Sequence, residues 1–162
     1  MIEYPKYKKV LFCTDFSENA DYAFEFAYGI AKRDEGVLYI LHVIPHNPNQ
    51  DCREGLVKKE VLEKIRKCIE EDIDNKYRKH YIEKIKNGIK FEIVTRSGKE
   101  DDEIIKFARH EKIDIIVMGT YGNTGIARVY FGSVAEKVFR RSPFPVFTVP
   151  CKKKLEYSYG DI

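Results

Sequence analysis

The stretch MGTYGNTGIARVYFGSV, residues 118–134, decides how the rest of the chain is interpreted. It follows the apolar run IDIIV, which reads as a buried strand, and leads into AEKVFRR, which has helical spacing. A loop between a strand and a helix thus carries four glycines, Gly119, Gly122, Gly125 and Gly132. Glycine permits positive φ angles and lets a ligand approach the backbone closely, so the loop is a candidate binding site.

A glycine-rich loop that opens onto a helix N-terminus is typical of phosphate binding. The unpaired N–H groups and the positive dipole end of the helix attract an anion, and Ser133 adds a hydroxyl donor. One alternative needs no ligand: Ser133 and Glu136 have the spacing of a capping box, and Gly119 could simply end a strand. The loop matches neither the P-loop GxxxxGK[ST] nor a Rossmann fingerprint, because no glycines follow the first strand.

Strand and helix signals alternate outward from this loop. The expected strands are residues 8–14, 37–44, 89–98, 113–119 and 145–150. Helical spacing predicts helices from the N-cap Ser17 to Gly36, over 55–86, from a Ser97/Glu100 capping box to near Lys112, and over 133–141. This order predicts an α/β fold: a doubly wound, five-stranded parallel sheet with helices on both faces. Ligands of such sheets bind at the carboxyl ends of the strands.

The helix expected at residues 55–86 is longer than the sheet can cover. At ~1.5 Å per residue it spans ~45 Å, whereas a strand spans ~17–20 Å. Part of it must overhang the sheet, or it must break near residues 72–75. Apolar residues recur at every fourth position, which rotates the stripe by ~40° per step: Val57, Val61, Ile65, Ile69, Ile73, Tyr77, Tyr81 and Ile85. A bent helix with a frayed end and a lid or partner-binding arm both remain open.

Composition narrows the class of protein. The 162 residues suit one domain, and 43% hydrophobic with 34% charged residues is typical of a globular chain. A net charge of +3 does not favour nucleic acid as a partner. There is no signal-peptide pattern and no apolar run of the ~18 residues that a membrane span needs, so we expect no membrane partner and a cytoplasmic location. The four cysteines, which include no CxxC pair, do not predict a zinc site.

At this level of detail the sequence resembles the universal stress protein family, in its ATP-binding branch. The spacing Gly119-x2-Gly122-x9-Gly132-Ser133 matches the motif of that branch. KKVLFCTDFS, LHVI, IDIIVMGTYG and SPFPVFTVP resemble its first, second and fourth strands and its closing segment. The resemblance covers about residues 8–150 and implies a Rossmann-like or flavodoxin-like sheet of order 3-2-1-4-5. Two departures are Tyr121, where many relatives carry a histidine or another polar residue, and a longer tail.

The resemblance also implies the domain organisation. Residues 1–150 would form a single nucleotide-binding domain of the universal stress type, with a long helical insert at about 52–87. Residues 151–162 would form a C-terminal tail. The closing strand, 145–150, would pair edge to edge with its twin in a homodimer, which would cover an otherwise exposed sheet edge.

The nucleotide that the resemblance implies is ATP with Mg²⁺ or Mn²⁺. Asp15, beside Thr14, matches the residue that lies against the ribose or the metal-bound phosphates, and it is the one candidate metal ligand, directly or through water. Val43 matches the backbone position that pairs with adenine, and Arg128 a basic position near the phosphates. The other expected contacts are Met118, Gly119, Gly122, Gly132, Ser133 and Val134. Without a ligand, Asp15 would be a turn residue, Val43 a core residue and Arg128 a solvated charge.

Residues for catalysis are harder to place than residues for binding. Acids at 100–103 open the helix that follows the third strand, where they could orient a water or simply complement the helix dipole. The four histidines fit no Ser/His/Asp or Cys/His arrangement, and His42 reads as a core or edge residue. We therefore expect an ATP-binding stress-response regulator that acts on an unknown downstream protein. Nucleotide occupancy would be its switch, with at most slow hydrolysis. The alternative is a nucleotide-free dimeric interaction module of the same fold.

Overall fold

Five parallel strands form the centre of the computed structural model, which describes residues 4–45, 59–85, 88–120 and 131–151. The strands are β1 (Lys9–Thr14), β2 (Val37–Pro45), β3 (Lys90–Gly98), β4 (Ile115–Gly119) and β5 (Val146–Val149). They lie in the order β3-β2-β1-β4-β5, and every neighbouring pair is parallel. The predicted fold class and strand order are confirmed.

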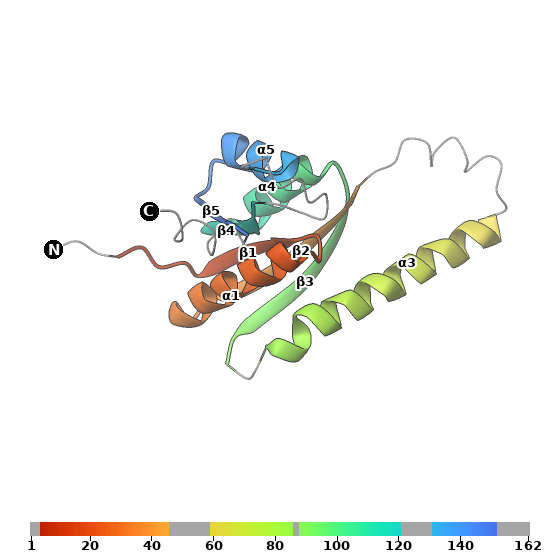
Figure 1. The fold of residues 1–162 in the computed structure, drawn as a ribbon, viewed down its shortest axis with the longest axis horizontal. Coiled ribbons are helices and arrows are strands. Elements are labelled where there is room, and N and C mark those ends of the chain that lie inside the picture. Colours follow the sequence, from red (N-terminus) through yellow and green to blue (C-terminus); the bar gives the residue numbers. More distant parts are fainter. Residues whose placement is uncertain (1–3, 46–58, 86–87, 121–130, 152–162) are drawn as a thin grey trace, which may run out of the picture.

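Helices cover both faces of this sheet (Figure 1). On one face lie α1 (Glu18–Arg33) and the C-terminal end of α3 (Lys59–His80), which is followed by the short 3₁₀ turn η1 (Ile82–Lys84). On the other face lie α4 (Glu100–Glu111) and α5 (Ser133–Arg141). Successive side chains of a strand point to opposite faces, so Phe12 of β1 joins the first core and Leu11 joins the second.

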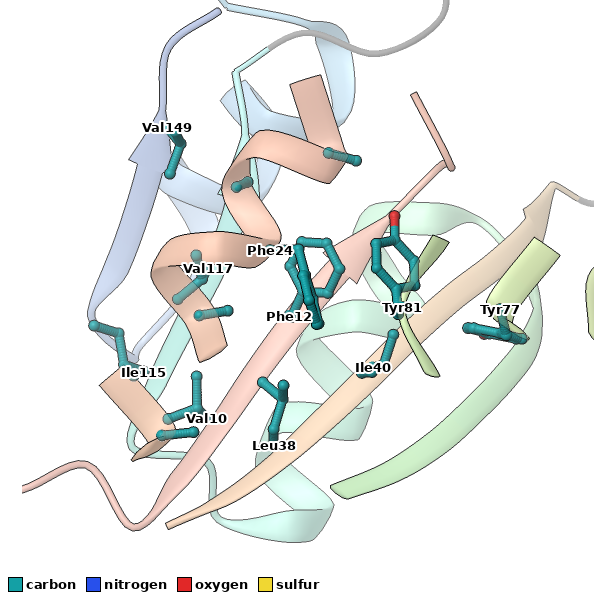
Figure 2. Close-up of a cluster of buried hydrophobic side chains, with 14 of the residues drawn as sticks. Val10, Phe12, Phe24, Leu38, Ile40, Tyr77, Tyr81, Ile115, Val117 and Val149 are labelled. Atoms are coloured by element: carbon teal, nitrogen blue, oxygen red, sulfur yellow. The ribbon is translucent and has the colours of Figure 1, made fainter. Parts of the chain in front are cut away.

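Aromatic rings join the end of α3 to the first core (Figure 2). The fully buried ring of Phe12 packs edge to face against Phe24, with 5.6 Å between ring centroids, and against Tyr81 at 5.3 Å. Such pairs contribute ~0.5–1.5 kcal/mol beyond the burial of their surface. The C-terminal end of α3 is therefore part of the domain core.

The start of α1 agrees with the sequence, but its end does not. Ser17 is the N-cap, and its side chain accepts a hydrogen bond from the N–H of Ala20 at 3.2 Å. The helix ends at Arg33, and the left-handed residue that follows is Glu35, with φ of 50°, rather than Gly36. Gly36 has a different reason to be glycine, because a Cβ there would lie 2.7 Å from the carbonyl oxygens of residues 7 and 8.

The predicted Ser97/Glu100 capping box does not form, and neither does the Ser133/Glu136 box that was the ligand-free alternative. Ser97 lies inside β3, and the N-cap of α4 is Lys99, whose side chain makes no capping hydrogen bond in the described part of the chain. The N-cap of α5 is Gly132, so Ser133 is already the first helical residue and cannot serve as the cap. The predicted end of α4 near Lys112 is correct, since this residue is the left-handed C-cap. Both helix starts therefore lack the side-chain acceptor that a capping box would supply.

Helix α3 is continuous through residues 72–75, so of the two alternatives for the long helix the break there does not occur. Figure 1 shows that the helix instead reaches past the sheet. Within α3 the buried residues are Ile73 and Tyr77, close to its C-terminal end. Residues 55–58 and 86 of the predicted helix lie outside the described ranges. None of the helices in those ranges combines the length and apolar character needed to cross a membrane.

Candidate functional site

A cavity of about 460 Å³ opens at the carboxyl ends of β1, β2 and β4. The first turns of α4 and α5 close its sides. It lies where the strand order reverses, since β2 follows β1 on one side and β4 flanks β1 on the other. Ligands of doubly wound sheets bind at this kind of switch point, so the cavity is the candidate functional site.

Most of the predicted binding residues line this one cavity. Those that do so are Thr14, Asp15, Val43, Met118, Gly119, Gly132, Ser133 and Val134. The other two, Gly122 and Arg128, lie outside the described residues, as does Tyr121. Positions separated by more than a hundred residues in sequence thus meet around a single hollow, although their contact with a nucleotide stays a prediction.

The turn after β1 gives Asp15 a structural role beside the predicted one. The Asp15 Oδ1 atom accepts a hydrogen bond from the backbone N–H of Ser17 at 3.1 Å, which is the local turn geometry typical of aspartate. Phe16 lies between them in the left-handed region, with φ of 61°. Asp15 therefore holds the turn and also lines the cavity, and one role does not exclude the other.

Thr14 and His42 are hydrogen-bonded to each other. Thr14 is also hydrogen-bonded to Tyr81, just after α3, and His42 to Tyr77 near the end of α3. The Thr14 hydroxyl accepts from the N–H of Phe16 at 2.8 Å and lies 2.5 Å from the hydroxyl of Tyr81. The Thr14 carbonyl accepts from Nδ1 of His42 at 2.8 Å, which places a proton on that nitrogen. Burial lowers the pKa of His42 below its usual value, so its ring is neutral near pH 7. His42 lines the cavity, a position that its reading as a core or edge residue missed.

At the cavity wall a hydrogen bond joins Thr120 to Gly132, and a second one joins Thr120 to β5. The N–H of Gly132 donates to the carbonyl of Thr120 at 2.6 Å, and the N–H of Thr120 donates to Val149 of β5 at 2.9 Å. At Gly119 a Cβ would lie 2.6 Å from the side-chain nitrogen of Asn19. The glycine at 119 is therefore required by the packing of α1, whether or not a ligand binds.

Thr120 is the feature of this wall that the sequence did not single out. It is only 5% exposed, and its hydroxyl oxygen has no hydrogen-bond partner among the described residues. A buried polar group without a partner costs about 1–3 kcal/mol. Thr120 lines the cavity, but its hydroxyl oxygen is itself shielded from solvent, so a polar group of a ligand would relieve that cost only if the wall shifted to expose the oxygen.

The first turn of α5 supplies backbone donors to the same cavity. The helical hydrogen bond that starts the helix runs from the N–H of Glu136 to the carbonyl of Gly132, at 2.9 Å. The N–H groups of residues 133–135 come before it and have no partner within the helix. All three residues line the cavity, so the positive end of the helix dipole is at its wall. The arrangement suits an anion.

The four acids at the start of α4 have separate roles. Asp101, which is buried, and Asp102 both pair with Arg141 of α5 and with Lys99. Glu103 pairs with a neighbouring lysine of its own helix, at 2.8 Å. The guanidinium of Arg141, together with Lys99, lowers the pKa of Asp102. Most of the acidic run thus joins α4 to α5.

Glu100 is the member of the acidic run that lines the cavity, together with Asp15. Within the described ranges, no group of three or more histidine, cysteine, aspartate or glutamate side chains could hold a metal ion by itself. A cation at this site would therefore need oxygen ligands from water or from a bound ligand.

Comparison with known proteins identifies relatives over nearly the whole chain. The model of the family described as Universal stress protein family matches residues 6–150. Among curated proteins, Universal stress protein MJ0577 of Methanocaldococcus jannaschii is 34% identical over 158 residues, which cover 90% of this chain and 96% of that protein. Universal stress protein MJ0531 of the same organism is 33% identical over 159 residues, with 91% and 85% covered.

Solved structures agree with this comparison. The structure of MJ0577 superposes with a TM-score of 0.73 at 30% identity and covers 91% of this chain and 99% of its own. A universal stress protein from Archaeoglobus fulgidus, solved in complex with dAMP, has a TM-score of 0.54 at 22% identity, with 89% and 98% covered. At that identity the second structure is similar in fold alone.

Proposed function

This chain belongs to the universal stress protein family, and on this premise we propose that it is a stress-response regulator whose cavity binds ATP. Nucleotide occupancy of the site would act as its switch. The proposal rests on the resemblance of the glycine–serine motif to the ATP-binding branch of the family and on the chemistry of the cavity wall.

The observation that carries the proposal is that two kinds of polar group without a hydrogen-bond partner lie at one wall of the cavity. The N–H groups at the start of α5 have no partner within the helix, and Ser133 is not placed to cap them. The buried hydroxyl of Thr120 lines the same hollow and lacks a partner among the described residues. Phosphate oxygens would accept hydrogen bonds from the helix N–H groups, and from the Thr120 hydroxyl once the wall shifted to expose it. The cavity volume also falls within the ~300–1,000 Å³ range of small-molecule sites.

Each wall of the cavity would take one part of the nucleotide. Phosphates would bind the N–H groups of Ser133 and Val134, and the predicted Gly122 and Arg128 contacts belong to the same part. Asp15 would lie against the ribose or the metal-bound phosphates, and the backbone at Val43 would pair with adenine. The complex of the Archaeoglobus fulgidus relative with dAMP supports the idea that this fold can hold an adenine nucleotide.

A divalent cation fits the charges of the site. Asp15 and Glu100 both line the cavity, and two carboxylates would repel a triphosphate unless a cation lay between them. Mg²⁺ usually keeps several waters and binds through one or two carboxylates plus phosphate oxygens, which agrees with the sparse set of protein ligands here. We therefore propose ATP with Mg²⁺ or Mn²⁺. At most slow hydrolysis is expected, because hydrolysis needs a precisely placed water in addition to charge stabilisation.

A homodimer through residues 145–150 is the proposed assembly. β5 is an edge strand of the sheet, and its outer side has no neighbour within the described chain. Phe147 on this strand is 40% exposed and packs against Phe26 of α1, with 5.7 Å between ring centroids. Pairing with the β5 of a second copy would cover this edge and the apolar surface beside it.

Nucleotide release and calorimetry test the proposed binding. The protein is purified and denatured, any released nucleotide is identified, and ATP binding with Mg²⁺ is measured by calorimetry. Thr120→Val removes the hydroxyl while keeping the shape, and Ser133→Pro removes a backbone N–H at the first helical position, where proline is tolerated. We expect both variants to fold and to bind ATP at least about tenfold more weakly, as for the loss of a hydrogen bond to a charged group.

Ser133→Ala is the matched control, because it removes the hydroxyl and keeps the backbone donor. It should bind more tightly than Ser133→Pro. A native protein that carries no nucleotide and shows no heat of ATP binding would overturn the proposal. The glycines would then serve the loop and the packing of α1, and the nucleotide-free interaction module would be the better description.

A further inference from the structure

The outer part of α3 carries an apolar surface that the rest of the domain does not cover. Val61, Ile65 and Ile69 are 44%, 45% and 37% exposed, and Cys68 between them is also exposed. We call these four residues the outer stripe. Figure 1 shows this end of α3 lying beyond the sheet. Apolar surface gathered on one face of a helix marks an interaction site.

The geometry of the helix keeps the outer stripe away from the domain. Each step of four residues rotates the side chain by about 40°. From Ile65 to the buried Ile73 the rotation is therefore about 80°, and to the buried Tyr77 about 120°. The face that meets the core near the end of α3 is thus not the face that carries the outer stripe.

Two opposite charges lie symmetrically about Cys68 in the groove of the outer stripe. Lys64 lies four residues before Cys68 and Asp72 four residues after it, and all three line one shallow groove with the apolar residues. Two helices that cross antiparallel at Cys68 would place Lys64 of each copy opposite Asp72 of the other. A parallel pair would instead place like charges opposite each other, which is unfavourable. One Asp72 oxygen already accepts from Lys76 at 2.7 Å, and the carboxylate has a second oxygen to accept from another cation.

We propose that the outer stripe binds the outer stripe of a second copy of this chain, antiparallel and with its two-fold axis at Cys68. Such a contact is self-complementary, as a two-fold interface must be. Charged residues beside the apolar seam fix its orientation, as they do in coiled coils. The stripe is only a few turns long, so the association is weak and depends on protein concentration.

This contact goes beyond nucleotide binding and differs from the β5 pairing proposed above. The end of α3 packs beside β2 and β3, whereas β5 forms the opposite edge of the sheet. A chain could use both surfaces at once and so build assemblies larger than a dimer. Neither contact requires nucleotide to be bound.

Cross-linking at Cys68 tests the proposal. In a Cys52→Ser/Cys151→Ser background, Cys68 is the accessible thiol, because Cys13 is buried. A short bismaleimide should link two chains through Cys68, increasingly so at higher protein concentration. The matched control is Cys68→Ser/Glu70→Cys, which moves the thiol about 200° around the same helix to the opposite face. We expect it to give little cross-linked dimer, whether or not the β5 edges are paired.

Charge-reversal variants in the same cross-linking experiment test the antiparallel charge pairing directly. Lys64→Asp alone, or Asp72→Lys alone, places like charges opposite each other in a dimer of identical chains. Each variant should lose roughly fivefold or more of the cross-linked product. An equimolar mixture of the two should regain it as a mixed dimer, because both pairs are then complementary. Both positions lie on the exposed face of a continuous helix, so circular dichroism should show both variants folded.

Three results would overturn the proposal. One is equal cross-linking by Cys68 and by the Glu70→Cys control, which would indicate random collision. Another is a Cys68 that fails to react with a simple maleimide, which would mean that another part of the same chain covers the stripe. The third is a mixture of the two charge variants that cross-links no better than each variant alone.

Discussion

The two ends of α3 share one sequence pattern and have opposite surroundings. Apolar residues stand at every fourth position in both, as Val61, Ile65 and Ile69 at the outer end and as Ile73 and Tyr77 at the other, and Tyr81 continues the repeat directly after the helix. The first three are exposed, whereas the last three are at most 6% exposed. We call Ile73, Tyr77 and Tyr81 the root of α3, and Figure 2 shows both tyrosines of the root in the core.

Hydrogen bonds join the root to the strand ends that form the cavity. The Tyr77 hydroxyl donates to the carbonyl of Val94 at 2.8 Å and accepts from the N–H of His42 at 3.0 Å. Burial raises the pKa of Tyr77 to about 12, so this hydroxyl keeps its proton. The Tyr81 hydroxyl meets Thr14 at the end of β1, and Phe16 packs against both tyrosine rings. The root therefore supports one wall of the candidate site.

The comparison teaches that a repeat specifies a helix without specifying its environment. A four-residue repeat turns slowly around the helix, so the apolar stripe faces the sheet over only part of its length. Beyond the sheet the apolar side chains of the repeat face solvent. Any stabilising contact that they make must therefore be with a surface outside this domain core. The difference can be measured directly by truncating one residue in each part.

The largest expected effect separates the two parts of α3 by their contribution to folding. Tyr77→Ala should lower the free energy of unfolding by about 3–5 kcal/mol, because it leaves a cavity in the core. It also removes the hydrogen-bond partner of His42 and Val94. Ile65→Ala should change the free energy by less than about 0.5 kcal/mol, since Ile65 is exposed in the single chain. Urea denaturation at low protein concentration measures both, and similar losses in the two variants would contradict this division.

A smaller effect concerns the hydroxyl groups of the root. Tyr77→Phe should cost about 1–3 kcal/mol, because two backbone groups lose their partner. Tyr81→Phe should cost only about 1 kcal/mol, because the Thr14 hydroxyl keeps its hydrogen bond from the N–H of Phe16. Equilibrium unfolding of the two variants beside the native protein gives both values. If Tyr81→Phe were the more destabilising change, the root would hold the cavity wall mainly through β1 instead of through β2 and β3.

The parts of this structure that could be predicted from the sequence are those set by local pattern. Apolar runs predict the strands, and the resemblance of the motifs gives eight predicted binding positions that line one cavity in the structure. The Ser97/Glu100 capping box is a wrong prediction, and the alternative box at Ser133 and Glu136 does not form either, because a cap depends on where one residue leaves helical geometry. Spacing alone does not show which residue takes that role.

Contacts between distant residues are equally hidden in the sequence. Thr14 meets Tyr81 across 67 positions, and no local pattern marks that pair. Thr120 and His42 reach the cavity because their strands end there, although neither of them was assigned to the site from the sequence. Where α3 leaves the sheet depends on how far the sheet extends, so the exposure of the outer stripe also followed only from the structure.

The smallest expected effect is the response to acid of His42, the strand residue that donates a hydrogen bond to Tyr77 of the root. The outer stripe has no counterpart, because residues 61–69 include no histidine. Burial lowers the pKa of His42 in the folded chain below the usual value of 6.5, so the unfolded chain binds this proton more readily. The free energy of unfolding should therefore fall as the pH drops through 6.5 and below, and recover above it. Urea midpoints between pH 7.5 and 5 should decline less steeply for His42→Gln than for the native protein. The difference should be modest, because the residue is partly exposed and water still reaches its charged form. Parallel pH profiles would instead mean that groups other than His42 cause the loss of stability in acid. His42 would then serve the cavity wall only as a donor to Thr14.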